Sequence, residues 1–370
     1  MNTGRILVVD DETGMLRSIE RVLGHDYKVT ATRIPREALE LAKTLSPDLA
    51  ILDIQMPDMD GFELMEKLQA VDPELEIILM TGSIHEIDAK LIRAIRKEAF
   101  YFLQKPFDRE VLLTLVERCL ELKRLDGENR KHLQRMEREL AEARAFQQSL
   151  LPPAQDKLSG ISVFARYLPC SELAGDFYDY IACGPDSVTL LVADVSGHGA
   201  SAAMLTGIVK SAFHSASSDG YAPSSILDRV ANGIRAFDHR HFITLICVCV
   251  RKGALEFVNA GHPAGILRKA DAATVLLEST GPLVTPAFSN HSWEHHTIPT
   301  HDKDRIVLFT DGIIEAGSES EMYGLDRLIE LVRKHPGSGG VLLDQILDSA
   351  RQFAAGRPMH DDLTLVAADL

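Results

Sequence analysis

The segment Ile6-Leu-Val-Val-Asp-Asp11 joins a continuous apolar run to two adjacent carboxylates. Similar apolar runs follow at Leu49–Leu52 and Ile77–Met80, and amphipathic stretches lie between them at Thr13–Gly24 and Pro35–Leu45. Short runs that are apolar throughout are typical of parallel strands buried on both faces. Their alternation with amphipathic stretches predicts an α/β domain with a doubly wound parallel sheet.

Polar side chains stand at the carboxyl ends of these predicted strands, at Asp10, Asp11, Asp53, Thr81 and Lys105. Ligands of doubly wound folds bind at that edge of the sheet, so we expect these side chains to share one site. A carboxylate that attacks a phosphoryl group needs nearby cations to offset the repulsion between two anions, and a bound metal and a lysine would supply them. The alternative, a strand-end turn beside an exposed lysine, leaves the shared position of the five residues unexplained.

Over essentially its whole length this segment resembles the receiver domain of two-component response regulators. The resemblance rests on Val8-Val-Asp-Asp-Glu12, Leu52-Asp-Ile-Gln-Met-Pro-Asp-Met-Asp-Gly61, Met80-Thr-Gly82 and Leu103-Gln-Lys-Pro-Phe107. It implies that a cognate histidine kinase or phosphotransfer protein phosphorylates Asp53 in a Mg²⁺-dependent reaction. The implied roles are Mg²⁺ binding by Asp10, Asp11, Asp53 and the Gln55 carbonyl, contact with the phosphoryl oxygens by Thr81 and Lys105, and aromatic switching by Phe102.

Four short acidic stretches mark the C-terminal half, namely Ala174-Gly-Asp-Phe-Tyr-Asp179, Asp194-Val-Ser-Gly-His-Gly199, Phe309-Thr-Asp-Gly-Ile313 and Asp361-Asp-Leu-Thr364. Each places a carboxylate beside a strand or a turn, and hard divalent cations such as Mg²⁺ and Mn²⁺ select oxygen ligands of this kind. The alternative for these aspartates is turn capping in solvated loops. Predicted strands such as Val188–Ala193 and Phe242–Val250 alternate with predicted helices such as Ala200–Ser217, which indicates an α+β sandwich flanked by helices.

Residues 160–370 resemble the metal-dependent (PPM) serine/threonine phosphatases, in their bacterial SpoIIE/RsbU-like branch. The resemblance adds Asn259-Ala-Gly-His262 to the four acidic motifs. It implies an αββα sandwich with two Mg²⁺ or Mn²⁺ ions at one edge. The implied ligands are Asp176, Asp194 as the bridging carboxylate, the Val195 carbonyl, Asp311 and Asp361. Asp179 and Asp362 are expected to orient these ligands from behind them, His198 to steady the metal loop, and His262 to be structural.

The segment between the two halves carries a heptad pattern. Nine of its twelve a and d positions are apolar, at Leu112, Leu115, Cys119, Leu122, Leu133, Met136, Leu140, Ala143 and Leu150. This pattern predicts a coiled-coil helix that pairs with a second copy of the chain in a parallel homodimer. The polar stretch Asp126-Gly-Glu-Asn129 is expected to separate the last receiver helix from a linker helix, and Leu151-Pro-Pro153 to end the linker. The alternative is a helix packed on its own chain.

Together these patterns predict a receiver domain at 1–122, a helical linker at 123–155 and a phosphatase domain at 156–370. In the 370 residues, 54 acidic side chains outnumber 39 basic ones and no basic stripe is present, which argues against nucleic acid as a direct ligand. The start lacks the layout of a signal peptide, and no apolar run is long enough to span a bilayer. Five dispersed cysteines fit a reducing compartment, so we expect a cytoplasmic protein.

The expected function is a phosphatase that is controlled by phosphorylation at Asp53. By resemblance, its substrate is a phosphorylated anti-anti-sigma (STAS-type) protein in a partner-switching pathway. The alternative is a non-catalytic adaptor that binds or sequesters a regulatory protein. The presence of all four central aspartates favours catalysis. A DNA-binding regulator is disfavoured, because no basic recognition helix follows the receiver.

Overall fold

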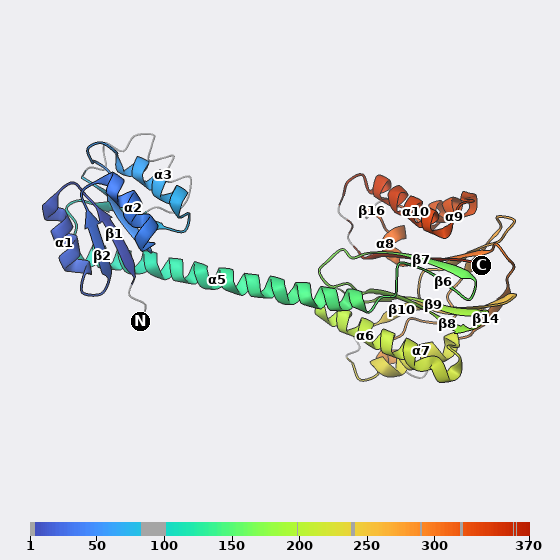
Figure 1. Cartoon of the computed structure of the whole chain (residues 1–370). Coiled ribbons are helices and arrows are strands. Elements are labelled where there is room, and N and C mark those ends of the chain that lie inside the picture. Colours follow the sequence, from blue (N-terminus) through green and yellow to red (C-terminus); the bar gives the residue numbers. More distant parts are fainter. Residues whose placement is uncertain are drawn as a thin grey trace. The chain divides into compact units, whose positions relative to one another are not determined.

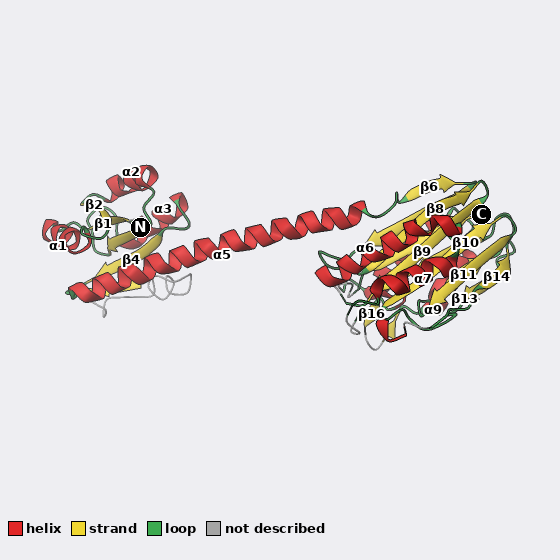
Figure 2. Cartoon of the chain, turned by 90° about the horizontal axis from the view of Figure 1, so that it is seen from below, coloured by secondary structure: helices red, strands yellow, loops and turns green. Residues whose placement is uncertain are grey.

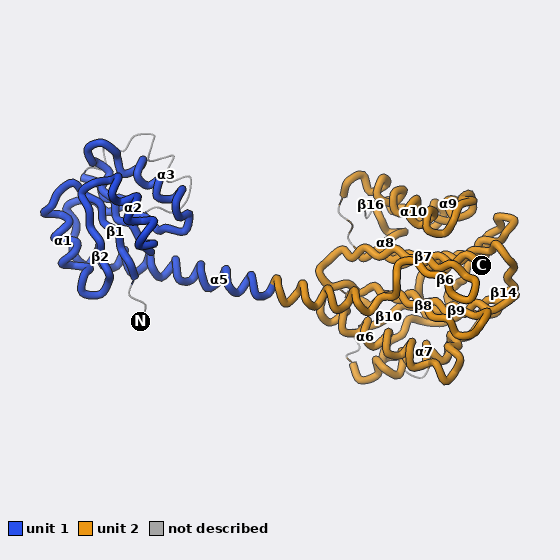
Figure 3. Tube along the Cα trace, in the orientation of Figure 1, with its two compact units in different colours: residues 1–136 blue, residues 137–370 orange. Residues whose placement is uncertain are grey.

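The computed structural model describes residues 4–82, 101–197, 199–237, 241–288, 291–318, 321–357, 359 and 361–370. The chain divides into two compact units, residues 1–136 and residues 137–370 (Figure 3). The division falls inside one helix, α5 (Arg109–Ser149).

Unit 1 is built around a parallel sheet. Among its described residues, five strands pair in the order β2-β1-β3-β4-β5, and every pairing is parallel. The strands are β1 (Arg5–Val9), β2 (Lys28–Thr32), β3 (Leu49–Asp53), β4 (Glu76–Thr81) and β5 (Tyr101–Gln104). All five residues of β3 are buried, as expected for a central strand covered on both faces.

Helices cover both faces of this sheet. One hydrophobic cluster packs α1 (Thr13–Leu23) and the first turns of α5 against one face, through residues that include Ile19, Leu112 and Val116. The other cluster packs α2 (Pro35–Leu45) and α3 (Gly61–Val71) against the opposite face. The predicted doubly wound α/β fold is therefore confirmed.

Helix α5 is continuous, so the break expected at Asp126–Asn129 is wrong. A single glycine in a helix interior costs only about 1 kcal/mol relative to alanine. Helix formers flank Gly127 on both sides, and the i,i+4 ion pair between Arg124 and Glu128 spans it at 2.7 Å. The helix ends at Ser149, just before the two prolines, as predicted.

The described residues of unit 2 form two large antiparallel sheets and a two-stranded one, β16 (Gly317–Ser318) with β17 (Glu321–Met322). Among its described residues, one large sheet has five strands in the order β14-β11-β10-β9-β8, and the other has six in the order β13-β12-β15-β18-β7-β6. The strands of the first are β8 (Asp176–Gly184), β9 (Ser187–Val195), β10 (Ile243–Arg251), β11 (Ala254–Ala260) and β14 (His296–Pro299). Those of the second are β6 (Gln155–Leu158), β7 (Ile161–Leu168), β12 (Gly265–Arg268), β13 (Thr274–Leu277), β15 (Arg305–Phe309) and β18 (Leu363–Asp369).

The two large sheets of unit 2 pack face to face between layers of helices (Figure 1). Figure 2 shows α6 (Ala200–Ser215) and α7 (Pro223–Ile234) on the outer face of the five-stranded sheet, where they form one hydrophobic cluster with it. The outer face of the six-stranded sheet packs against α8 (Asp311–Ile314), α9 (Leu325–Lys334) and α10 (Gly339–Ala354). The predicted αββα sandwich is confirmed. Within the described ranges, no helix has the length and apolar character needed to cross a bilayer.

Candidate functional site

Lys105 joins two buried carboxylates at the carboxyl edge of the sheet in unit 1. Its Nζ lies 2.7 Å from Asp10 Oδ2 and 3.1 Å from Asp53 Oδ1. Oxygen atoms of Asp10, Asp11 and Asp53 lie within 4.8 Å of one another, close enough to bind one cation. The sequence placed these residues at the ends of different strands, and the parallel order of those strands brings them together.

The electrostatics of this site suit a carboxylate that reacts with phosphate. Burial raises the pKa of Asp53, and Asp10 adds to the rise, whereas Lys105 and the Gln55 backbone N–H oppose it. Burial also lowers the pKa of Lys105, but its bonds to Asp10 and Asp53 outweigh this effect and leave it raised. The lysine therefore stays charged beside the carboxylates.

The other residues predicted for the receiver site lie around Lys105 and its two carboxylate partners. Thr81 is buried at the end of β4, and its carbonyl accepts the Lys105 N–H at 2.7 Å. Phe102 lies in β5, half-buried against the cluster that packs α2 and α3. The role of the Gln55 carbonyl as a metal ligand stays a prediction.

The second candidate site lies at one edge of the sandwich in unit 2. Asp176 and Asp194 stand directly opposite each other on β8 and β9, so their side chains project from the same face of the sheet. That face is turned towards the other sheet, because Thr310 and Thr364 of the six-stranded side donate hydrogen bonds to Asp176 Oδ2 at 2.7 and 2.5 Å. Asp311 is the first residue of α8, directly after Thr310.

The carboxylates of this edge raise one another's pKa. Burial raises the pKa of Asp194 to about 7, and Asp311, Asp361, Asp362 and Glu315 add to the rise. The pKa of Asp176 lies well above its usual value because of burial and then Asp194. The pKa of Asp311 is raised by burial and then by Asp361 and Glu315. The structure thus brings all four aspartates that the sequence singled out to one edge. Among the described residues of unit 2, the ligand atoms that lie within 4.8 Å of one another are those of Cys170, Asp361 and Asp362.

This donor set fits divalent cations. The charged groups that shift the pKa values of Asp176, Asp194 and Asp311 are all carboxylates. Several half-buried or buried carboxylates can be ionised together only if cations offset their mutual repulsion. Oxygen-only ligands of this kind are those that Mg²⁺ and Mn²⁺ prefer.

Close backbone contacts at two glycines shape the edge. A side chain at Gly175 would place its Cβ 2.5 Å from the Val195 carbonyl oxygen, and Val195 N donates to the Gly175 carbonyl at 3.2 Å. The Val195 carbonyl, a predicted ligand, therefore lies against the start of β8. Gly312 packs in the same way on the carbonyl of Asp362. Only glycine permits these two approaches.

The two flanking aspartates have different roles. Asp362 is buried, and its carboxylate accepts the N–H groups of Cys170 and Gly175, each at 2.8 Å, so it holds the loop before Asp176. Asp179 instead bonds Lys210 and His214 of α6 at 2.9 Å each. Successive strand residues point to opposite faces, and three positions separate Asp179 from Asp176. Its expected role behind the metal ligands is wrong.

Sequence reasoning missed a contact between α5 and the acidic edge. Gln147 is buried, and its amide donates to the Ala174 carbonyl at 2.7 Å and accepts the Ala174 N–H at 3.1 Å. Ala174 directly precedes Gly175 and Asp176. The available signal was that Gln147 is a polar residue at an a position of the heptad pattern. Sequence reasoning also missed Glu315 and two threonines, Thr310 and Thr364. Both threonines lie inside the acidic motifs. His198 lies outside the described residues.

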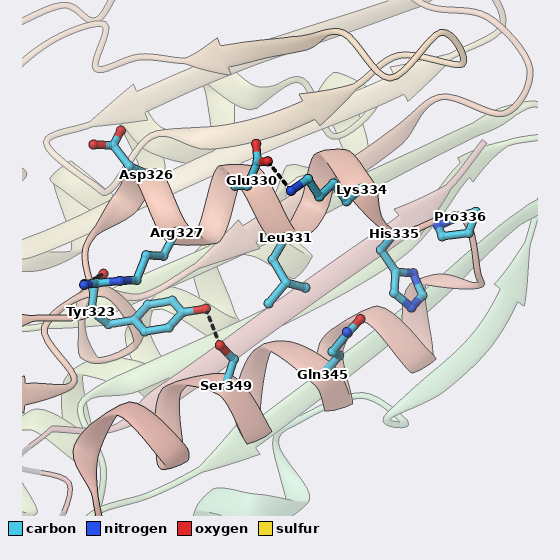
Figure 4. A pocket seen from close by; sticks show the side chains of 10 residues that line it. All are labelled: Tyr323, Asp326, Arg327, Glu330, Leu331, Lys334, His335, Pro336, Gln345 and Ser349. Atoms are coloured by element: carbon cyan, nitrogen blue, oxygen red, sulfur yellow. Dashed lines mark hydrogen bonds and ion pairs between the residues drawn. The ribbon is translucent and has the colours of Figure 1, made fainter.

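A separate groove of about 650 Å³ lies between α9 and α10 (Figure 4). It contains none of the acidic motifs. Two pairs of its side chains bond each other, Glu330 with Lys334 at 2.6 Å and Tyr323 with Ser349 at 2.9 Å.

Comparisons with known proteins agree with this architecture. The family model of the response regulator receiver domain matches residues 6–117, and that of stage II sporulation protein E (SpoIIE) matches residues 184–370. The chain is 26% identical over 243 residues to phosphoserine phosphatase RsbP of Bacillus subtilis, which covers 63% of this chain and 58% of RsbP. It is 25% identical over 260 residues to protein IcfG of Synechocystis sp., which covers 62% of this chain and 41% of IcfG.

A solved structure, the SiaA-PP2C domain of Pseudomonas aeruginosa, superposes with a TM-score of 0.56 at 19% identity, over 65% of this chain and 98% of that domain. This likeness shows a shared fold. The chain spans about half the length of the two curated relatives, 58% of RsbP and 41% of IcfG.

Proposed function

The chain belongs to the SpoIIE family and carries a response-regulator receiver domain, and from this premise we propose that it is a receiver-controlled, metal-dependent protein serine/threonine phosphatase. The observation that carries the proposal is the cluster of carboxylates at one edge of the sandwich, whose charges raise one another's pKa. A cluster of this kind costs folding free energy unless cations bind to it.

The residues of the edge have distinct tasks in this proposal. Asp194 is the central ligand, because its carboxylate interacts with Asp176 on the neighbouring strand and with Asp311 and Asp361 across the edge. Two threonine hydroxyls hold Asp176 in one orientation, and Asp311, Asp361 and the Val195 carbonyl complete the donor set. Two Mg²⁺ or Mn²⁺ ions bound there would activate water for attack on phosphorus and offset the charge of the phosphoryl oxygens.

The test is Mn²⁺-dependent release of p-nitrophenol from p-nitrophenyl phosphate by the full chain. Asp194→Ala and Asp311→Ala should each abolish it. Asp348→Ala, which removes an exposed carboxylate of α10, is the control and should keep full activity. Unimpaired hydrolysis by both site variants would reject the proposal. A wild-type chain without activity at any Mn²⁺ concentration would favour the adaptor alternative.

We propose that phosphorylation of Asp53 controls this activity through α5. The receiver end of α5 is packed into the core of unit 1 at Leu112, Val116 and Cys119. Its other end binds Ala174 through Gln147, beside the acidic edge. A shift of α5 could therefore affect both sites. Beryllium fluoride, a phosphoryl mimic, should change the phosphatase rate of the wild-type chain and not that of Asp53→Ala. An unchanged wild-type rate would reject the coupling.

The homodimer remains part of this proposal. Leu133, Met136 and Leu140 lie on α5 with exposed fractions of 60%, 59% and 38% in the single chain. Apolar side chains at a and d positions are stabilised when a second helix covers them. Light scattering should give the mass of two chains at micromolar concentration, with or without beryllium fluoride. The mass of one chain under both conditions would contradict the dimer.

The proposed substrate is a phosphoserine or phosphothreonine on an anti-anti-sigma (STAS-type) protein, whose dephosphorylation would release a sigma factor by partner switching. The support is the resemblance to the SpoIIE family and the similarity to RsbP, which is described as a phosphoserine phosphatase. The test is phosphate release from a phosphorylated STAS-type protein from the same cell. If the chain hydrolyses p-nitrophenyl phosphate but not this protein, the phosphatase proposal stands and the proposed substrate is rejected.

A further inference from the structure

His262 lies where the chain crosses from one sheet of unit 2 to the other, between β11 and β12. It is 4% exposed, and its backbone N–H donates to Asn259 Oδ1 at 2.8 Å. The Asn259 amide in turn donates to the Leu277 carbonyl at 3.0 Å. Gly261 turns the chain with a φ of 64°, and a Cβ there would lie 2.9 Å from Leu283 N. The turn itself therefore fixes the backbone that carries the imidazole.

One side of the imidazole contacts the strand beside Asp194. His262 Nδ1 and Thr244 Oγ1 are hydrogen-bonded at 2.8 Å. Thr244 of β10 stands directly opposite Asp194 of β9, which itself stands opposite Asp176 of β8. Side chains opposed in this way lie on one face, with Cβ atoms about 4.5–5.5 Å apart. His262 therefore ends a polar row that runs from Asp176 through Asp194 and Thr244.

The other side of the imidazole lies near the six-stranded sheet. The Phe309 carbonyl interacts with His262 and partly offsets the effect of burial, which lowers the pKa of the imidazole to about 3. The ring is thus neutral at physiological pH. Its Nε2 is buried and has no hydrogen-bond partner in the part of the chain that the structure describes. Phe309 stands two residues before Asp311, at the end of β15.

We propose that His262 is a positioning residue that sets the separation of Asp194 and Asp311 and thereby the affinity of the acidic edge for Mn²⁺. This inference rests on the proposed function. Its physical basis is that a neutral imidazole has one donor and one acceptor nitrogen, on opposite sides of a rigid ring. The ring pairs with Thr244 of one sheet and also interacts with the Phe309 carbonyl at the strand end that leads to Asp311 of the other.

The test measures Mn²⁺ binding without using catalysis. Trp293 is the only tryptophan of the chain and belongs to unit 2, where it packs against the cluster beneath α6 and α7. Its fluorescence therefore follows the unfolding of unit 2 alone in the full-length protein. The rise of the unfolding temperature with Mn²⁺ concentration gives an apparent dissociation constant.

Thr244→Val keeps the size of the side chain and removes the hydroxyl, and His262→Phe removes both ring nitrogens. Each should weaken Mn²⁺ binding roughly tenfold, the lower end of the effect seen when groups that orient metal ligands are removed. Thr244→Ser retains the hydroxyl and should bind Mn²⁺ within about threefold of wild type. His262→Asn, which can pair with Thr244 through its amide, should recover part of the loss.

A purely structural role predicts a different pattern, in which the variants unfold at lower temperature in EDTA but keep the wild-type dissociation constant. That pattern, or an affinity within twofold of wild type for Thr244→Val, overturns the inference. If His262→Phe does not fold, the comparison of Thr244→Val with Thr244→Ser decides alone. A wild-type chain whose unit 2 gains no stability from Mn²⁺ overturns this inference together with the proposed function.

Discussion

Replacing Asp194 with asparagine tests the electrostatics of the acidic edge directly. In the folded chain without metal, burial and neighbouring carboxylates raise the pKa of Asp194 from 3.8 to about 7. This rise corresponds to about 4 kcal/mol against the charged form. Asp194 is partly exposed, so solvent screening reduces the figure to ~2 kcal/mol. Asp194→Asn removes this cost and should stabilise the metal-free protein at pH 7.5.

The sign of the pH dependence follows from the direction of the shift. A carboxyl group with a raised pKa in the folded state binds more protons folded than unfolded. Its contribution to stability is therefore fully present below pH ~4 and is lost as the pH rises through about 7. The advantage of Asp194→Asn over wild type should be largest at pH 7.5 and should shrink as the pH falls to 5.

The assay is thermal unfolding of the full-length protein in EDTA, followed by Trp293 fluorescence. For a unit of this size, ~2 kcal/mol raises the midpoint by about 4–8 °C. Mn²⁺ should then stabilise wild type but not the variant, because the central ligand is lost. A midpoint that falls or stays unchanged in EDTA, or an undiminished response to Mn²⁺, would refute the reasoning.

Asp179→Asn is the matched control, because it makes the same substitution three positions after Asp176 on β8. Asp179 is 2% exposed and bonds Lys210 and His214 at 2.9 Å each. Removing its charge leaves both partners without their carboxylate, so its midpoint should fall rather than rise. Mn²⁺ should still stabilise this variant as it stabilises wild type. If the unfolding midpoint rises for Asp194→Asn and falls for Asp179→Asn, the first carboxylate belongs to an unpaired acidic cluster and the second is an ion-paired carboxylate.

Three further outcomes are expected. Gln147→Leu breaks both hydrogen bonds of the Gln147 amide to Ala174, so the phosphatase rate should no longer respond to beryllium fluoride. The unfolding midpoint of unit 1 in circular dichroism should be unchanged. A full response to beryllium fluoride would exclude Gln147 as the link between α5 and the acidic edge. Gly175→Ala should lower Mn²⁺ affinity at least about tenfold, because its Cβ would press on the Val195 carbonyl, and calorimetry giving wild-type affinity would contradict that contact. Met136→Glu should reduce the light-scattering mass from that of two chains to that of one, because a charge at a d position disfavours helix pairing. A variant that remains a dimer would point to another interface.

Several features of the site could be read from local patterns alone. Asp10 and Asp53 follow apolar runs, and parallel order then requires their side chains to meet at one edge. The motifs around Asp176, Asp194 and Asp311 likewise placed each carboxylate beside a strand or a turn. Asp179 could have been separated from Asp176 in advance, because an odd spacing along a strand turns two side chains to opposite faces.

Other features had no local signature. The heptad pattern treats the residues of α5 alike, yet Leu112 is buried in the receiver core, Leu133 is exposed and Gln147 is buried against Ala174. The polar stretch around Gly127 signalled a break, but the cost of one glycine is small against the rest of a long helix. Which of these competing preferences prevails depends on the packing partners of each turn.

Periodicity and motif spacing determined the element types, the two halves and the candidate aspartates, because these depend on residues close together in the chain. Only the tertiary structure decided which side chains meet: Asp176 bonds threonines 134 and 188 positions away. It also decided that Asp179 faces α6 and that Gln147 reaches the acidic edge. The physical reason is that burial and Coulomb interactions depend on distances in space, which the packing of the two sheets and α5 sets.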